Sequence, residues 1–412
     1  MIGVDRPRLA GVDVTPFEYQ GESYYRLSSR EGLSEEWLMV PQSYGPVLRL
    51  LDGRNTLAQV RTRLASESGY SVTHAFLTRL LQQLDQVFLV DTARYRTRRE
   101  EVINAFRRSS VREPSHAGGA YPREPEELRA TMRKMFEDTD GPGLPRPYGR
   151  SNGLRGILSP HIDFRRGGSS FAWGFKELAE RSHATLFVVI GTSHYSMERF
   201  VLSKKDYKTP LGIAKTDTAF VERVANAYGA ECFADELAIR PEHSIEFQVL
   251  FLQYLFEGIK DFTIVPLLVG SFHDSVESGK DPRELADIRK MGDAIREAER
   301  ACGKEVCYVS SGDLAHIGMK FGDPWLIDEQ KSEWCRSEDK KLLEHLETAD
   351  PAKLHASILR ERDRRRICGY PPTFMMLEAA APQSGKTLQY DQFVDPNGFE
   401  IVSFASMAFY RH

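Results

Sequence analysis

The sequence predicts an α/β protein with a central mixed sheet flanked by helices, preceded by a small α+β domain. The first observation is a set of four apolar runs, at residues 154–160, 184–191, 262–270 and 305–311. Near-continuous apolar runs of this length are typical of strands that are buried on both faces. The second observation is that these runs alternate with helix-like stretches, which favours a sheet covered by helices on both sides. The third is a different pattern before about residue 110, where short aromatic and apolar segments precede amphipathic ones.

Residues 1–95 form the predicted N-terminal module. Thr56 and Gln59 have the spacing of a capping box, and Gly53 ends the helix expected before them. Three helices with short flanking strands suggest a winged-helix arrangement. The expected order is strands at 24–27 and 37–40, helices at 46–51, 56–64 and 76–87, and a closing strand at 88–91.

Residues 96–112 are predicted to be a linker, partly helical, and their arginines are most simply a solvated charge run. Residues 113–412 form the predicted α/β domain, which is long enough for one large core. Its further elements are helices at 128–136, 284–301, 332–346 and 352–362, and a final, antiparallel strand at 401–410.

The composition is that of an ordinary globular protein, with 41% hydrophobic and 28% charged residues. A formal net charge of -4 gives no electrostatic reason to expect nucleic acid as a partner. No membrane association is expected, because no apolar run approaches the roughly 20 residues that span a bilayer. The N-terminus lacks the apolar core of a secretory signal. The five cysteines have no CxxC spacing, which favours reduced thiols in a cytoplasmic protein.

Chemically capable side chains follow three of the four predicted buried strands. His161 follows the first strand, His194 the second, and Asp313 with His316 the last. Ligands of open α/β sheets bind beyond the carboxyl ends of the strands, so these side chains are expected to meet at one site. Two imidazoles favour iron, copper or zinc over magnesium or calcium. The alternative for each histidine is a hydrogen-bonded structural role.

Asp313 and His316 have the spacing of one helical turn. On a first turn the two side chains would point the same way, and Asp313 would orient His316 for general acid/base work. The alternative is a capping aspartate beside an incidental histidine.

A histidine between two carboxylates makes residues 242–246 a further candidate. Glu242 and Glu246 would share one face of a helix that Ser244 caps. A carboxylate in this position would orient a metal-bound histidine. The alternative is a polar helix start with no chemical role.

Cys368 differs from the other four cysteines in its setting. The glycine and prolines after it predict a loop, and Arg364, Arg365 and Arg366 precede it. Positive charge stabilises a thiolate, which is a soft metal ligand. The arginines are otherwise a solvated helix face. Phosphate-loop, dinucleotide-binding, nucleophile-elbow and HExxH motifs are absent from the sequence.

Several stretches taken together, in their order and approximate spacing, resemble the Memo family over about residues 110–412. They lie at residues 115–121, 159–161, 191–194, 207–211, 242–246, 265–270, 310–313 with His316, and 367–369. The resemblance implies a fold similar to that of class III extradiol dioxygenases, with their non-haem iron centre.

The resemblance also implies roles for individual residues. A glutamate of the dioxygenases is replaced by Cys368, which would make the centre softer and more tolerant of copper(I). His316, with Asp313, would stand where the dioxygenases keep an acid/base histidine, and His243 would border the same pocket. Asp163 departs from the family pattern and would add a carboxylate near the site. The implied metal ligands are His161, His194 and Cys368.

Partners are implied as well. In bacteria and archaea, Memo-like proteins are associated with a radical-SAM protein and a further partner, the AmmeMemoRadiSam set. The N-terminal module resembles PqqD-like modules, which present precursor peptides to modifying enzymes. The stretches behind this are residues 38–41, 47–53, 56–64 and 76–90. The alternative is a scaffold or dimerisation domain.

Three functions are compatible with the sequence. The first is a metal-dependent oxidoreductase with iron or copper, in which Asp313 and His316 handle protons beside His243. The second is a non-catalytic adaptor that binds a peptide in the same pocket. The third is a zinc hydrolase, in which two imidazoles and one thiolate hold the metal and a bound water.

Overall fold

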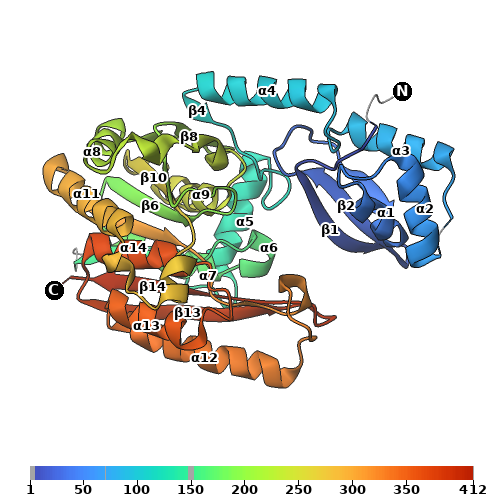
Figure 1. The fold of residues 1–412 in the computed structure, drawn as a ribbon. Coiled ribbons are helices and arrows are strands. Elements are labelled where there is room, and N and C mark those ends of the chain that lie inside the picture. Colours follow the sequence, from blue (N-terminus) through green and yellow to red (C-terminus); the bar gives the residue numbers. More distant parts are fainter. Residues whose placement is uncertain (1–4, 70, 147–152, 412) are drawn as a thin grey trace. The chain divides into compact units, whose positions relative to one another are not determined.

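A computed structural model describes residues 5–69, 71–146 and 153–411 of the chain. The chain divides into two compact units, Met1–Ser109 and Ser110–His412 (Figure 1). Helix α4 (Ala93–Arg108) ends directly before this boundary. Most of the segment expected to be a linker is therefore helical and belongs to the first unit.

In the residues that the structure describes, the first unit combines a three-stranded antiparallel sheet with four α-helices and one short 3-10 helix. The predicted capping box is formed, because the Thr56 side chain accepts from the Gln59 N–H and the Gln59 side chain accepts from the Thr56 N–H. The closing strand predicted at residues 88–91 is wrong, since only Val90 pairs, in a single bridge to Leu9. The elements are β1 (Val12–Tyr19), β2 (Glu22–Ser29), β3 (Leu38–Pro41), α1 (Gly45–Leu50), α2 (Leu57–Ser68), α3 (His74–Gln86) and α4.

The second unit is built on a mixed sheet in the order β12-β14-β5-β11-β6-β10-β9-β8-β4, with β13 beside β14 and β7 beside β10. All four predicted buried strands are present, and so is the predicted final strand. The strands are β4 (Val111–Arg112), β5 (Leu154–Ser159), β6 (Leu186–Thr192), β7 (Phe200–Leu202), β8 (Asp206–Thr209), β9 (Gly212–Thr216), β10 (Thr263–Val269), β11 (Val306–Ser311), β12 (His316–Ile317), β13 (Ser384–Val394) and β14 (Ile401–Tyr410).

The centre of this sheet is parallel. Strands β5, β11, β6 and β10 run in the same direction, whereas β14 runs antiparallel to β5 with Met407 opposite Leu158. The carboxyl ends of β5, β11 and β6 therefore lie at one edge of the sheet, as the sequence predicts. The predicted α/β class with a mixed sheet is confirmed.

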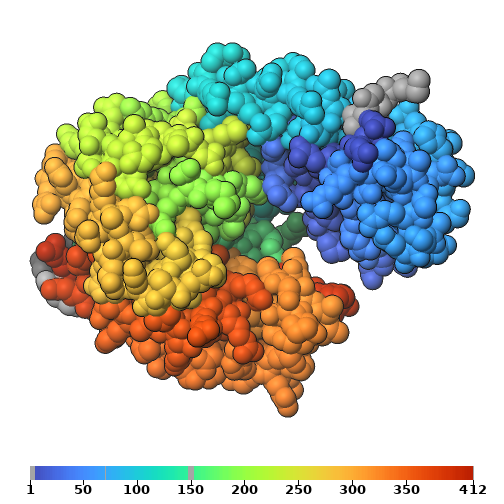
Figure 2. Space-filling view, viewed as in Figure 1, coloured from blue at the N-terminus to red at the C-terminus, as the bar shows by residue number. Residues whose placement is uncertain are grey.

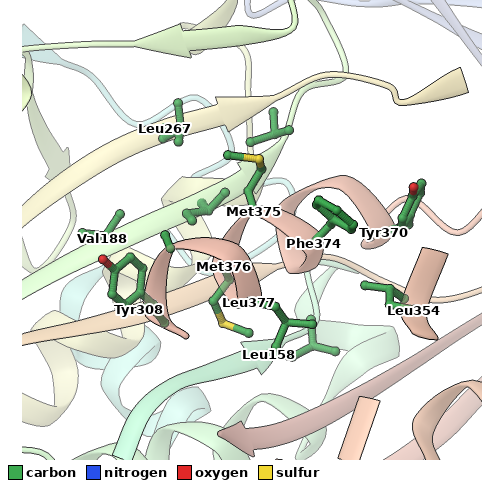
Figure 3. Close-up of a cluster of buried hydrophobic side chains, with 14 of the residues drawn as sticks. Leu158, Val188, Leu267, Tyr308, Leu354, Tyr370, Phe374, Met375, Met376 and Leu377 are labelled. Carbon is green, nitrogen blue, oxygen red and sulfur yellow. The ribbon is translucent and has the colours of Figure 1, made fainter. Parts of the chain in front are cut away.

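Helices cover both faces of the sheet. Helix α9 is buried almost all round, from Ser244 to Phe256, and packs on one face with α5 and α7. On the other face, α14 places Phe374, Met375 and Met376 against the strands (Figure 3). The helices are α5 (Pro125–Glu137), α6 (Phe164–Gly167), α7 (Ser170–Arg181), α8 (Thr218–Tyr228), α9 (Ser244–Phe256), α10 (His273–Ser278), α11 (Ala286–Cys302), α12 (Glu329–Glu347), α13 (Pro351–Glu361) and α14 (Tyr370–Ala380).

Figure 2 shows the outside of this unit, where the gold and orange residues of α10 to α13 form an outer layer. Among the described residues, no helix is both long enough and apolar enough to cross a membrane.

Candidate metal centre

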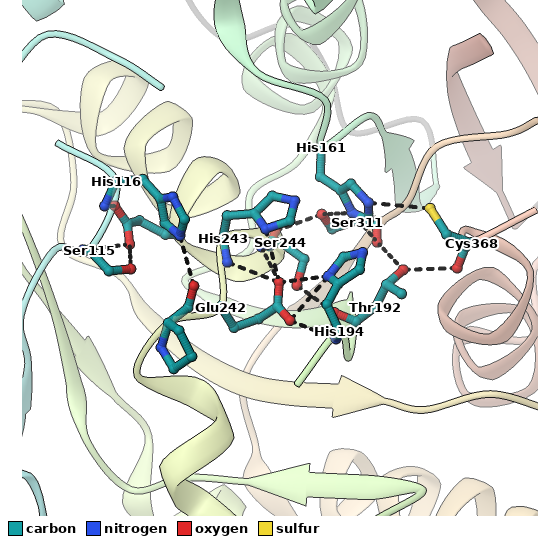
Figure 4. A network of polar contacts seen from close by, with 12 residues as sticks. Ser115, His116, His161, Thr192, His194, Glu242, His243, Ser244, Ser311 and Cys368 are labelled. Atoms are coloured by element: carbon teal, nitrogen blue, oxygen red, sulfur yellow. Dashed lines mark hydrogen bonds and ion pairs between the residues drawn. The ribbon is translucent and has the colours of Figure 1, made fainter. Parts of the chain in front are cut away.

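Three histidines meet at the carboxyl edge of the sheet. His161 follows β5, His194 follows β6, and His243 lies directly before α9. The ring centroids of His161 and His194 are 5.1 Å apart, and the His243 ring lies 5.1 Å from the first and 4.8 Å from the second. Figure 4 shows the three rings side by side. The predicted convergence of His161 and His194 is therefore seen in the geometry.

The ring nitrogens of these histidines have the arrangement of a metal site. One ligand atom from each of His161, His194 and His243 lies within 4.8 Å of the others. Each Nδ1 faces an oxygen, the Ser311 carbonyl at 3.3 Å for His161 and the Glu242 carboxylate at 3.0 Å and 3.3 Å for His194 and His243. An Nδ1–H that donates to such an acceptor leaves Nε2 with its lone pair. The three residues thus fit a metal ion that is bound through Nε2.

Glu242 organises two of these rings. Its carboxylate is 1% exposed and accepts from the backbone N–H groups of His194, His243 and Ser244. Burial alone would raise the pKa of this carboxyl, but the adjacent His194 and the hydrogen bonds hold it far below its usual range. Glu242 is therefore a fixed negative charge behind the imidazoles, as expected for a carboxylate that orients a metal-bound histidine.

The protonation of the three rings differs. Burial lowers the pKa of His161 well below its usual value, and the neighbouring His194 lowers it further. Burial lowers the pKa of His243 in the same way and outweighs the charge of Glu242. Burial would also lower the pKa of His194, but Glu242 outweighs that effect and raises it. His161 and His243 are consequently neutral near pH 7, the form that binds metals.

Cys368 lies on the other side of His161. Its Sγ is 3.3 Å from His161 Nε2 and accepts from the backbone N–H of Asp313 at 3.3 Å. Burial raises the pKa of this thiol well above its usual value, and the charge of Asp313 raises it further. With Asp313, the residues His161 and Cys368 form a second metal-capable group. Cys368, an expected metal ligand, therefore lies next to His161, another expected ligand.

Two glycines allow the loop that carries Cys368 to lie against the loop after β11. A Cβ on Gly312 would clash with the Cα of Gly369, and a Cβ on Gly369 would lie 2.7 Å from the Asp313 carbonyl oxygen. Only residues without side chains let the loop after β11 touch the loop of Cys368.

The expectation that Arg364 to Arg366 stabilise a Cys368 thiolate is wrong. Arg365 pairs with the buried Asp339, Arg366 pairs with Asp323, and Arg364 lies over the Trp334 ring. These guanidinium groups are therefore engaged elsewhere, and the thiol keeps its proton in the absence of a metal.

The helical turn predicted for Asp313 and His316 is wrong. Residues 312–315 are not helical, and His316 begins the short strand β12. Asp313 accepts from the backbone N–H groups of His161 and Ile162, and its other oxygen lies 3.8 Å from His161 Nε2. The Nδ1 of His316 lies 3.1 Å from the Arg366 carbonyl oxygen. Asp313 therefore supports His161, while His316 is held by a carbonyl group.

Two expectations around residues 242–246 also fail. The Ser244 hydroxyl donates to the Thr192 carbonyl and does not cap α9. Glu242 lies before the helix, so it does not share a helical face with Glu246. Glu246 instead bonds with Arg112 and Tyr121, and this buried group holds the loop of His116 against the His243 ring. Sequence reasoning missed it, because Arg112 and Glu246 are 134 residues apart.

Asp163, expected near the site as an additional carboxylate, has another role. Its side chain accepts from the backbone N–H groups of Arg165 and Arg166 at the start of α6 and also pairs with the Arg166 guanidinium.

Comparison with known proteins identifies the family. The sequence model of the Memo family, described as "Memo-like protein", matches residues 112–408. The chain belongs to the Memo family. A MEMO1 family protein of Aquifex aeolicus is 29% identical over 409 residues, which are 98% of this chain and all of that protein. A MEMO1 family protein of Methanopyrus kandleri is 28% identical over 309 residues, 73% of this chain and 99% of that protein.

The two relatives differ in how much of this chain they match. The Aquifex protein aligns along nearly the whole chain and so extends through the N-terminal unit. The Methanopyrus protein aligns over 99% of its own length but with only 73% of this chain. The Methanopyrus protein therefore matches a smaller share of this chain than the Aquifex protein does. The PqqD-like or winged-helix nature of the N-terminal unit stays a prediction.

Proposed function

We propose that this Memo protein is a metal-dependent oxidoreductase with a mononuclear iron or copper centre. The observation that carries the proposal is the position of His161, whose ring lies 5.1 Å from the His194 ring on one side and whose Nε2 lies 3.3 Å from the Cys368 thiol on the other. Imidazoles together with a thiolate suit iron and copper(I), and they suit zinc as well. Iron or copper, when bound, would supply electron transfer and a coordination position for dioxygen or substrate.

The protein's own residues would prepare this chemistry. Glu242 holds the His194 Nδ1 and so directs its Nε2 toward the metal position. Cys368 would lose its proton on binding, because a coordinated thiol is deprotonated outright. Asp313, whose own pKa is raised by burial, and His316 lie beside the centre and would take up and return protons.

A second candidate is a zinc hydrolase, which the third imidazole favours. His161, His194 and His243 offer three nitrogen ligands, a donor set that catalytic zinc sites use with water as the fourth ligand. The two candidates share His161 and His194 and differ in the third ligand, Cys368 for the redox centre and His243 for zinc.

The partners and location are part of the same proposal. The Memo likeness supports action alongside a radical-SAM protein, and the PqqD-like resemblance of the N-terminal unit supports presentation of a peptide. The cysteine pattern supports a cytoplasmic location. An adaptor that binds a peptide without turnover is the alternative, and it predicts no consumption of dioxygen.

Metal analysis of protein made without oxygen tests the proposal. Wild type, Cys368→Ser and His243→Gln would be compared, with His74→Gln in the N-terminal unit as a matched control. Stoichiometric iron or copper that is lost in Cys368→Ser but kept in His243→Gln and the control supports the redox centre. Zinc that is lost in His243→Gln and kept in Cys368→Ser supports the hydrolase. If wild type contains no metal even after reconstitution, both metal-dependent functions are wrong and the adaptor is the remaining candidate.

A further inference from the structure

A cavity of about 220 Å³ adjoins the candidate metal centre, because Cys368 is one of its lining residues. Cys368, a proposed metal ligand, and Thr192, which lies two residues before His194, belong to its wall. Phe272, Val276 and Ile367 give it an apolar part. Its polar lining residues include Ser193, His273, Asp363 and Arg366.

Asp363 brings a carboxylate without a salt-bridge partner among the described residues to this wall. It is followed by three arginines, yet their guanidinium groups turn to Trp334, to Asp339 and Glu361, and to Asp323. Within the part of the chain that the structure describes, Asp363 has no ion pair, and one of its oxygens accepts only from the Ile367 N–H. Burial raises the pKa of this carboxyl to about 6, although the nearby His273 and Arg365 act in the opposite direction. A half-buried carboxylate of this kind is stabilised by a cation that enters the cavity.

A second polar group on the same wall lacks a partner. The Ser193 Oγ is buried and has no hydrogen-bond partner among the described residues. Buried polar atoms are nearly always paired, so an unpaired one on a cavity wall points to a ligand or a bound water. Arg366 does not offer an anion site in this cavity, because both of its terminal nitrogens contact Asp323.

We propose that this cavity binds an alkylammonium group, whose N–H donors meet Asp363 and Ser193 while its carbon chain lies along Phe272, Val276 and Ile367. The inference deepens the proposed function, because it assigns to the metal centre a substrate that carries a primary amine. The amine has two sources with the same chemistry, a free small amine or the lysine side chain of a peptide.

Titration calorimetry with n-butylamine tests the site, and n-butanol serves as the uncharged analogue. The proteins are wild type, Asp363→Asn, and Glu297→Gln, which removes one exposed carboxylate of α11 from the same full-length chain. Asparagine keeps an acceptor for the Ile367 N–H and tolerates the left-handed backbone at residue 363, where φ is 51°. A native melting temperature shows that the variant is folded.

The expected result is binding of n-butylamine to wild type and to Glu297→Gln, weakened by at least about tenfold in Asp363→Asn, as for the loss of a charged hydrogen bond. Nα-acetyl-lysine methylamide binding more tightly than n-butylamine identifies a peptide as the source, and the reverse order identifies a free amine. Equal binding to Asp363→Asn, no binding to wild type, or equal binding of n-butanol overturns the proposal.

The titrations are run on metal-loaded and metal-stripped protein. Asp363 is not a proposed metal ligand, so amine binding is expected in both. If the protein binds the amine but takes up no metal, the proposed oxidoreductase function is wrong and the amine site stands. If it takes up metal but does not bind the amine, the amine site is wrong and the proposed function stands.

Discussion

Two metal-capable groups share His161, and they are built differently. On the imidazole side, His194 and His243 both face the buried carboxylate of Glu242, which is fixed by three backbone N–H groups. On the thiol side, Cys368 sits in a loop whose approach includes three non-glycine residues with left-handed backbone, Arg362, Asp363 and Arg366. Such conformations cost of order 1–3 kcal/mol each.

The two groups differ in the protonation of their ligand atoms before a metal binds. Two imidazoles on the first side are already neutral, because burial lowers the pKa of His161 and His243. The Cys368 thiol is protonated, because burial raises its pKa. Any proton that His194 releases on metal binding is common to both candidate centres. Binding through His243 would release little or no further proton, whereas binding through Cys368 must release one and so becomes weaker as the pH falls.

The largest expected effect is that of removing the shared residue. His161→Ala deletes a ligand from both groups, so we expect stoichiometric metal to disappear whichever third ligand is correct. Elemental analysis after anaerobic purification measures this, with His74→Gln as the control. Full metal content in a folded His161→Ala protein would mean that neither group is the metal site.

Glu242→Gln tests the carboxylate behind the imidazole side. The neutral amide would no longer hold His194 and His243 by charge, and loss of such a supporting group typically weakens metal affinity by about 10–100-fold. Competition with a chelator of known affinity measures the change, and thermal unfolding of the metal-free protein reports damage to the fold. An unchanged affinity would show that Glu242 serves the backbone alone.

The fold was largely predictable because its central strands are apolar on both faces. Runs such as residues 184–191 admit few other interpretations, and β6 and β11 were found within two residues of their ends. Strand β1 was missed because Pro16 lies inside it. Proline is tolerated there because β1 is an edge strand that pairs only with β2.

The position of the site in the fold could be predicted from the sequence, but most of the contacts within it could not. The rule that ligands bind beyond the carboxyl ends of strands brought His161, His194 and Asp313 together. Sequence spacing gave the wrong partner for Asp313, because that side chain bonds with residues more than 150 positions away. The same limit applies to Arg366, whose partner Asp323 is 43 residues distant.

The pH dependence of stability separates the two sides further. Asp363, in the loop that carries Cys368, has a pKa raised by burial from 3.8 to about 6. Between these values the folded protein holds more protons than the unfolded chain, so the free energy of unfolding falls as the pH rises through this window. Asp363→Asn should remove this decline and raise stability above pH 6. Urea unfolding of metal-free protein at pH 4.5 and 7.5 measures it, and equal pH slopes for both proteins would contradict it.

The smallest expected effect concerns the bond that links the two sides. Thr192, two residues before His194, donates its hydroxyl to the Cys368 carbonyl at 2.8 Å. Thr192→Val keeps the shape but loses this bond, and we expect a loss of about 1 kcal/mol in the free energy of unfolding. Because the bond fixes the Cys368 loop and not the imidazoles, a centre bound through the thiol should lose affinity, while one bound through His243 should not. Chelator competition measures the metal affinity of Thr192→Val, and its unfolding curve measures the loss of stability. Together they distinguish a centre bound through Cys368 from one bound through His243, even if removal of a ligand itself would disturb either centre.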